Sequence, residues 1–286
     1  SVWVYNLLTV EGLLIIRTMM LLNKKYRIFD VHNHIFPDNI AEKAVENIGR
    51  YYNIPMSEKG TVDALLKSGR QIGVDRYLVH SSATHEGQVK AINNYITDVV
   101  KSHNNMIGFG TLHFSLGDID TEVERIISLG LRGIKLHPEF QCFIIDEPSM
   151  MPVYKAISGK LPLLIHMGDQ NQDSSSPIRL ARVLDEFPDL VVIAAHFGGY
   201  SMWEDSRKYL IGRNVFMDTS SSLAFLDPSE AVDMIRSHGV DKFMFGSDYP
   251  MWRHSDELAR FLRLDLSEDE REAILYNNAA KLFGEA

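Results

Sequence analysis

Eight short apolar runs, separated by longer amphipathic stretches, constrain the fold of this 286-residue chain more than any other feature of its sequence. Each run is nearly continuous in apolar residues, as are strands that are covered on both faces of a parallel sheet. The stretches between them have helical spacing, and several end at Gly or just before Pro, where helices usually stop. The predicted strands lie at residues 27–32, 76–82, 106–113, 133–137, 162–168, 192–199, 215–221 and 242–248.

This alternation predicts an α/β fold, namely a distorted (β/α)8 TIM barrel with an N-terminal extension and C-terminal helices. A chain with 45% hydrophobic residues can bury a large core, and barrels of this kind reach this length as one domain. We assign residues 27–286 to a single barrel domain and residues 1–26 to the extension. Glu11 and Arg17 interrupt the apolar residues of that extension, so we expect it to pack on the barrel rather than to anchor in a membrane.

The charge of the chain narrows the range of partners. Its net charge is -9, and no block of five or more Lys or Arg residues occurs. Nucleic acid and anionic membrane surfaces are therefore disfavoured as partners. The single cysteine, Cys142, excludes an internal disulfide and fits a reducing cytoplasm. We expect a cytoplasmic protein that acts on a small, anionic molecule, and the sequence is compatible with a homodimer.

Polar side chains gather where the predicted strands end, which is where barrels of this kind build their active sites. In "FDVHNHIFP", two histidines one residue apart point to the same side of a strand, because strand side chains alternate with period two. Seven of the eleven histidines stand at strand ends, accompanied by Lys135, Asp218 and Asp248: they are His32, His34, His80, His113, His137, His166 and His196. The other four are expected on the surface, in helices or loops: His85, His103, His238 and His254.

Four of these side chains have the chemistry of a metal site. Zinc and similar ions take imidazole nitrogen and carboxylate oxygen at about 2.0–2.2 Å, and catalytic sites leave one position open for water. His32, His34, His166 and Asp248 supply such a set from the first, fifth and eighth predicted strands. A single histidine at a strand end is more often a hydrogen-bonded pocket residue than a ligand, so it is the convergence of several that favours a metal.

Several motifs together resemble the amidohydrolase superfamily, and within it the amidohydrolase-related branch, also called amidohydrolase 2. The matching stretches span about residues 27–284 and are "DVHNH", "GIKLHP", "LIHMG", "AHFGG", "FGSDYP" and "ILYNNAAKLFG". The resemblance implies metal ligation by His32, His34, His166 and Asp248, and it equates His196 with the histidine of the family's sixth strand. Residues 1–26 have no counterpart in it.

The main functional prediction is a metal-dependent hydrolase that directs a metal-activated water at a small amide, lactone or related acid. Asp248 would accept the proton of that water, and His196 would bond the water or the developing oxyanion. Lys135 or His137 would bind a substrate carboxylate. The alternative is a metal-dependent non-oxidative decarboxylase or hydratase of an unsaturated or aromatic carboxylic acid, because the branch includes decarboxylases, hydratases and lactonases. A non-catalytic metal-binding barrel is a third reading, and the combined presence of the ligands, His196 and "GSD" argues against it.

Three further expectations concern the surroundings of the site. We expect one divalent metal, Zn²⁺ before Mn²⁺, and the alternative is a binuclear centre bridged by a carboxylated Lys135, as in binuclear members of the superfamily. Residues 36–58 form the longest insert after a strand and could cover the site as a lid. Specificity is assigned to residues that follow the sixth and eighth strands, with packing of the loops as the alternative role: Tyr200, Trp203, Tyr249, Trp252 and Arg253.

Overall fold

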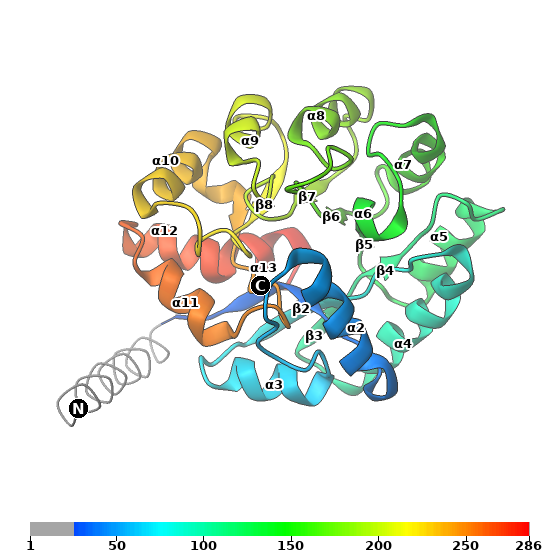
Figure 1. Cartoon of the computed structure of the whole chain (residues 1–286), viewed down its shortest axis with the longest axis horizontal. Helices are drawn as coiled ribbons and strands as arrows, with labels where there is room; N and C mark the ends of the chain where they lie inside the picture. Colours follow the sequence, from blue (N-terminus) through cyan, green and yellow to red (C-terminus); the bar gives the residue numbers. More distant parts are fainter. Residues whose placement is uncertain (1–25, 286) are drawn as a thin grey trace.

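A computed structural model describes residues 26–285, so the predicted extension, residues 1–26, lies outside the described residues except for its last member. The described chain forms a ring of helices around a central set of parallel strands (Figure 1). The strands are β1 (Phe29–His34), β2 (Arg76–His80), β3 (Met106–Gly108), β4 (Gly110–Thr111), β5 (Ile134–Leu136), β6 (Leu163–Ile165), β7 (Val192–Ala194), β8 (Phe216–Asp218) and β9 (Phe243–Met244).

Backbone hydrogen bonds close these strands into a barrel. The strands pair in parallel as β1-β2-β3 and as β4-β5-β6-β7-β8-β9. Phe109 alone separates β3 from β4, and its N–H donates to Val79 O at 3.0 Å, so β3 and β4 occupy one strand position. The other gap closes where Val31 N donates to Phe245 O at 3.0 Å. Eight strand positions in a closed ring confirm the predicted (β/α)8 barrel.

The helices cover the outside of the barrel and also its lower end. They are α2 (Asp38–Tyr52), α3 (Val62–Arg70), α4 (Val89–Ser102), α5 (Ile119–Ser128), α6 (Pro138–Gln141), α7 (Met151–Ile157), α8 (Pro177–Glu186), α9 (Trp203–Tyr209), α10 (Pro228–His238), α11 (His254–Leu262), α12 (Glu268–Glu272) and α13 (Asn278–Phe283), with short turns at η1 (Glu86–Gln88), η2 (Pro148–Met150), η3 (Val240–Lys242) and η4 (Ala273–Asn277). Side-chain caps define several starts, for example the capping box of Ser267 and Glu270 at α12. Among the described residues, no helix is both long enough and apolar enough to cross a membrane.

The inside of the barrel is divided into an apolar layer below and a polar layer above. Inward-facing apolar residues, among them Leu78 and Leu164, pack with Phe283 of α13, which plugs the lower end. Two residues further along the same strands stand His80 and His166, because every second side chain of a strand faces inward. The strand period that builds the core therefore also delivers polar groups to the upper mouth.

Two histidines that were predicted on the surface are buried instead. His238 at the end of α10 contacts Val215 O through Nε2 at 2.7 Å. His254 at the start of α11 contacts Ser68 Oγ through Nδ1 at 2.8 Å and a carboxylate oxygen of Asp30 through Nε2 at 3.0 Å. The prediction was wrong because tertiary packing supplies partners for both imidazoles, and a buried imidazole with partners is stable.

Candidate metal centre

The two histidines of β1 converge at the upper mouth of the barrel. Nε2 of His32 lies 3.2 Å from Nε2 of His34, whereas the side chain of Asn33 turns away and donates to Leu78 O. The pairing of β1 with β2 shifts register between Asp30 and Asn33. This irregularity places His32 on the inner side directly after the inward-facing Val31, which strict alternation would not allow.

Asp248 completes a triangle of ligand atoms with these histidines. Its Oδ1 lies 3.4 Å from Nε2 of His32 and 3.4 Å from Nε2 of His34. Ligand atoms of a tetrahedral zinc site with bonds of about 2.0 Å are separated by about 3.3 Å, so the three atoms fit one ion. Asp248 has a left-handed backbone, with φ of 57°, which is strained for a residue other than Gly and is common at functional sites.

The protonation states also suit a cation. Burial lowers the pKa of both His32 and His34, so these imidazoles are neutral and keep a free lone pair near neutral pH. Burial alone would raise the pKa of Asp248, but the neighbouring imidazoles, His32 foremost, outweigh it and hold that pKa well below its usual range. The triangle thus combines two neutral nitrogens with one anionic oxygen.

A second layer of hydrogen bonds orients His32. Its Nδ1 lies 2.8 Å from Oδ2 of Asp218 at the end of β8, and that carboxylate can only accept. The proton of His32 is therefore on Nδ1, and the lone pair of Nε2 faces the triangle. The other oxygen of Asp218 accepts from the backbone N–H groups of His196 and Ser220, both at 3.0 Å. Asp218, which sequence reasoning left without a role, thus orients a candidate ligand.

Asp30 ties the two strands that carry the triangle to each other. Its Oδ1 accepts from the N–H groups of His32 and Ser247, both at 3.0 Å, and its Oδ2 lies 3.0 Å from Nε2 of His254. All of these groups are fully buried. The carboxylate therefore joins the end of β1 to the loop that carries Asp248, from behind the triangle.

We predict that Asp30→Ala lowers the free energy of unfolding by about 3 kcal/mol or more, because two buried N–H groups and the buried hydroxyl of Ser247 lose their acceptor. Urea unfolding followed by circular dichroism measures this loss. Asp75→Ala is the matched control, because Asp75 accepts from a single backbone N–H, that of Ile28, on the rim. Equal losses in the two variants would show that the buried network around Asp30 adds no stability.

His166 and His196 face each other across the same cavity. Nε2 of His166 lies 2.8 Å from the carbonyl oxygen of Gly168, so that nitrogen must carry the proton. Nδ1 of His196 faces Ser220 O at 3.2 Å and Ser220 Oγ at 2.9 Å, while that hydroxyl donates to Asp218. Two lone pairs are left, Nδ1 of His166 and Nε2 of His196, only 3.0 Å apart. Such a contact is repulsive unless a proton or a cation lies between or beside these atoms, and this supports His166 as a ligand.

A helix outside the barrel covers this mouth. Tyr52, the last residue of α2, places its hydroxyl 3.1 Å from Nε2 of His137 and 3.3 Å from Nε2 of His166. Ile48 and Met56 from the same insert line the cavity beside it. Residues 36–58 therefore cover the site, as the sequence predicted. The length of the insert was the only signal in the sequence, and it did not single out Tyr52.

The small cavity under this cover joins most of the predicted site residues. It is lined by His34, Ile48, Tyr52, Met56, His137, Phe140, His166, His196, Tyr200, Ser221, Asp248, Pro250 and Met251. Below it Glu139, also missed from the sequence, lies 3.4 Å from Nδ1 of His137. Burial raises the pKa of Glu139 to about 7, although Ser174 and Ser175 donate to its other oxygen. The walls thus combine imidazoles, one carboxylate and aromatic rings.

Lys135 lies beside the triangle and is fully buried on β5. Its Nζ is 3.3 Å from Nε2 of His32. Burial lowers the pKa of Lys135 to about 8, although the carboxylates of Asp248, Asp218 and Glu139 oppose the shift. At neutral pH the amine of Lys135 is therefore still mostly protonated, and its positive charge lies deep in the barrel.

The structure does not bring every predicted specificity residue to the cavity. Arg253 is largely exposed, pairs with Glu58 at 3.3 Å and is not among the residues that line the cavity. Trp252 donates from its indole to Ser221 Oγ at 2.9 Å, and Ser221 donates in turn to Asp248. Trp252 therefore reaches the triangle only through Ser221.

The three remaining aromatic candidates divide between wall and scaffold. Tyr200 lines the cavity. Trp203 donates to the carbonyl oxygen of His196 at 3.1 Å and Tyr249 donates to Thr61 O at 3.1 Å, so both hold backbone in place.

Several solved structures share this architecture. The chain superposes on 5-carboxyvanillate decarboxylase from Sphingomonas paucimobilis with a TM-score of 0.70 and 17% identity, covering 91% of this chain and 99% of that one. It superposes on a dihydroxybenzoic acid decarboxylase from Polaromonas, with manganese and 2-nitroresorcinol bound, with a TM-score of 0.70 and 16% identity, covering 91% of this chain and 97% of that one. It superposes on a probable 2-pyrone-4,6-dicarboxylic acid hydrolase from Acinetobacter baumannii, with citric acid bound, with a TM-score of 0.66 and 17% identity, covering 90% of this chain and 99% of that one.

These likenesses establish the fold, and the sequence itself establishes the family. The family model described as Amidohydrolase, which corresponds to the amidohydrolase 2 branch, matches residues 29–284, nearly the whole described barrel. That range includes both histidines of β1, His166, His196 and Asp248. On these grounds the chain belongs to the amidohydrolase family of metal-dependent TIM-barrel enzymes.

Proposed function

We propose that this chain catalyses the metal-dependent, non-oxidative decarboxylation of a small aromatic carboxylic acid. This is the alternative that the sequence left open, and it replaces hydrolysis as the first choice. The observation that carries it is the aromatic wall of the cavity: Tyr52, Phe140 and Tyr200 line the space beside His34 and Asp248. A flat ring packs well against such walls, whereas a small amide or lactone needs none of them. Most of the similar solved structures are decarboxylases of aromatic acids.

We assign one divalent cation to His32, His34, His166 and Asp248. The imidazole-rich set suits Zn²⁺, and Mn²⁺ is an equal candidate because several of the similar decarboxylases contain manganese. When bound, the cation supplies positive charge that anchors and polarises the oxygens of the substrate. The binuclear alternative, with a carboxylated Lys135, stays open and is tested below.

The surrounding residues divide the remaining tasks. Lys135 and His137 hold the carboxylate or a neighbouring oxygen of the substrate, and Tyr52 and Tyr200 hold the ring. The bond between ring carbon and carboxyl carbon breaks, its electron pair stays on the ring carbon, and carbon dioxide leaves. His196, which keeps its own hydrogen on Nδ1, takes up a second proton from water on the Nε2 that borders the cavity and gives it to the ring carbon. Asp248 stays anionic and offsets the positive charges of the cation and of Lys135.

Product analysis tests the proposed reaction. Enzyme loaded with Mn²⁺ or Zn²⁺ is offered hydroxylated benzoic acids, lactones, amides and unsaturated acids, and both carbon dioxide and acid release are followed. We expect one carbon dioxide and one ring proton per aromatic acid consumed. Acid release from lactones or amides without carbon dioxide would overturn the proposal in favour of a hydrolase, for which Asp248 is the base.

Lys135→Met provides a separate prediction for the substrate carboxylate. Loss of a charge-assisted hydrogen bond of about 1.5–3 kcal/mol should lower kcat/KM about 10-fold to 100-fold, with the metal content unchanged. Steady-state kinetics and metal analysis of the same preparation measure both. Lys160→Met, on the exposed pair with Glu124, is the control and should behave like the wild type. A loss of bound metal in Lys135→Met would instead favour a lysine that ligates, as in the binuclear centre.

A further inference from the structure

His80 is a buried histidine for which the structure gives no hydrogen-bonding role. It ends β2, and its side chain is fully buried. Among the described residues, neither of its ring nitrogens has a hydrogen-bond partner. An imidazole ring presents one N–H and one lone pair when it is neutral, so both nitrogens of His80 need a partner. A buried polar ring without partners is costly, and such groups in native proteins usually contact a water or an ion.

Other buried histidines of this chain show that the situation of His80 is not general. His113 contacts Ser115 Oγ at 2.7 Å, and His238 contacts Val215 O at 2.7 Å. His254 lies between Ser68 and Asp30. Each of these imidazoles has at least one ring nitrogen within hydrogen-bond distance of a protein group, whereas His80 has none among the described residues. His80 differs from them in position as well, because it borders the triangle of His32, His34 and Asp248.

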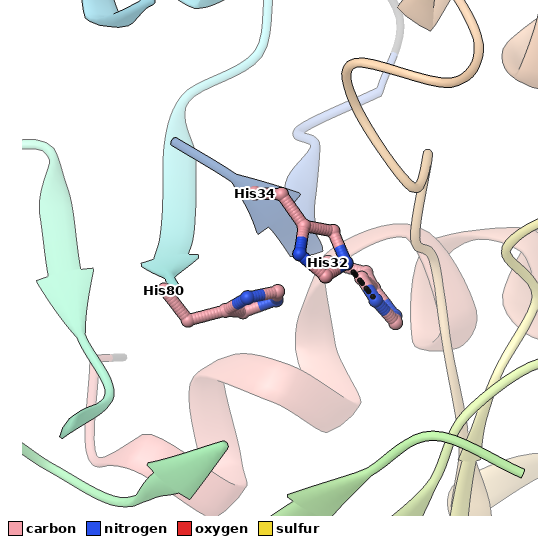
Figure 2. A group of neighbouring side chains, drawn as sticks. All are labelled: His32, His34 and His80. Carbon is pink, nitrogen blue, oxygen red and sulfur yellow. Dashed lines mark hydrogen bonds between the residues drawn. The ribbon is translucent and has the colours of Figure 1, made fainter. Parts of the chain in front are cut away.

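The geometry around His80 is that of a third imidazole on one centre. Figure 2 shows its side chain reaching from the end of β2 toward the two rings of β1. One nitrogen of each ring lies within 4.8 Å of the others. The ring centres are 5.2 Å apart for His32 and His34, 5.1 Å for His32 and His80, and 4.5 Å for His34 and His80.

Those separations can be compared with coordination chemistry. An imidazole bound at about 2.0–2.1 Å has its ring centre about 3.2 Å from the ion, so rings on adjacent corners are about 4.5–5.2 Å apart, from octahedral to tetrahedral angles. All three observed separations fall in this range. Mutual packing of neutral rings would also allow such distances, but it would leave both nitrogens of His80 without partners.

We propose that His80 is a ligand of the catalytic cation, added to the set that the family resemblance implies. This inference rests on the proposed metal site, and it goes beyond it in assigning a ligand to β2. With His32, His34, His166 and Asp248 it makes five protein ligands. An ion that accepts six would then have one position open for substrate, which suits Mn²⁺ better than a four-coordinate Zn²⁺.

Metal titration of histidine variants tests this assignment. Wild type, His80→Phe, His80→Asn and the control His113→Phe are stripped with a chelator and titrated with Mn²⁺. Electron paramagnetic resonance gives the affinity, and spin-echo modulation gives the number of coordinated nitrogens. We expect both His80 variants to bind Mn²⁺ at least about 100-fold more weakly, more than the 10–100-fold typical of residues that only orient ligands, and to show one nitrogen fewer.

Thermal unfolding separates ligation from a structural role. The metal-free His80→Phe protein should melt no lower than the metal-free wild type, because no hydrogen bond is removed. The rise in melting temperature on adding Mn²⁺ should shrink, because weaker binding stabilises the native state less. His113→Phe should keep the full rise, and His80→Asn covers the case in which Phe fits poorly.

The possible outcomes are distinct. Unchanged affinity and an unchanged nitrogen count in both His80 variants would overturn the assignment of His80 and leave the other ligands in place. Wild-type enzyme that binds Mn²⁺ through His80 but releases no carbon dioxide would overturn the proposed reaction alone. A wild type that takes up no cation would overturn both.

Discussion

His34→Ala is expected to release the metal and to abolish turnover while the barrel stays folded. The substitution removes one corner of the triangle, whose three ligand atoms lie only 3.2–3.4 Å apart. Loss of one imidazole from this triangle should weaken binding enough for the ion to be lost at micromolar concentrations, so we expect a loss of activity of about 1,000-fold or more, the scale of removing metal-based catalysis.

The fold should survive this change for a local reason. The backbone N–H of His34 donates to Tyr249 O at 2.7 Å, and an alanine keeps that bond. The side chain already borders a cavity, so truncation removes little packing. Circular dichroism and metal analysis of the purified variant check both points. His85→Ala, at an exposed loop position, is the control and should keep its metal. A full complement of metal in His34→Ala would remove His34 from the ligand set.

His196→Asn is expected to keep the metal and to lose turnover about 100-fold or more, in the range typical of a general acid or base. The imidazole borders the cavity through Nε2, and an amide in its place can form a hydrogen bond but cannot transfer a proton. Asparagine is chosen because His196 has a left-handed backbone, with φ of 61°, which Asn tolerates better than most residues. The effect should fall on kcat rather than on KM.

Metal content distinguishes the roles that remain open for His196. His103→Asn is a matched control, since the His103 side chain contacts Val99 O near the end of α4 and lies outside the cavity lining. It should retain the full rate and the full metal content. A His196→Asn protein that loses metal together with activity would make His196 a ligand, and the single-ion site would then have to be replaced by the binuclear one.

Hydrophobic patterning predicted the barrel because the strands of a covered parallel sheet must be apolar on both faces. All of the observed strands except β1 are shorter than predicted; residues 162–168 contain only Leu163–Ile165 as β6. The difference arises because the residues that follow each strand leave the ladder to direct His166 and its counterparts into the mouth. The third predicted strand is interrupted at Phe109, between β3 and β4. The flanking Gly108 and Gly110 have no side chains, which allows Ile96, Leu131 and Asn93 to approach closely there.

The sequence by itself determined the barrel, the order of its strands and the identity of the side chains at its mouth, because these depend on local period and on where each strand ends. Only the tertiary structure decided which of those side chains meet. Tyr52 reaches His137 through the docking of α2, Asp30 reaches His254 across 224 positions of the chain, and the register shift in β1 turns His32 inward. That His80 finds no hydrogen-bond partner within residues 26–285 is likewise visible only in the folded protein, because hydrogen bonds between distant segments depend on packing that no local pattern encodes.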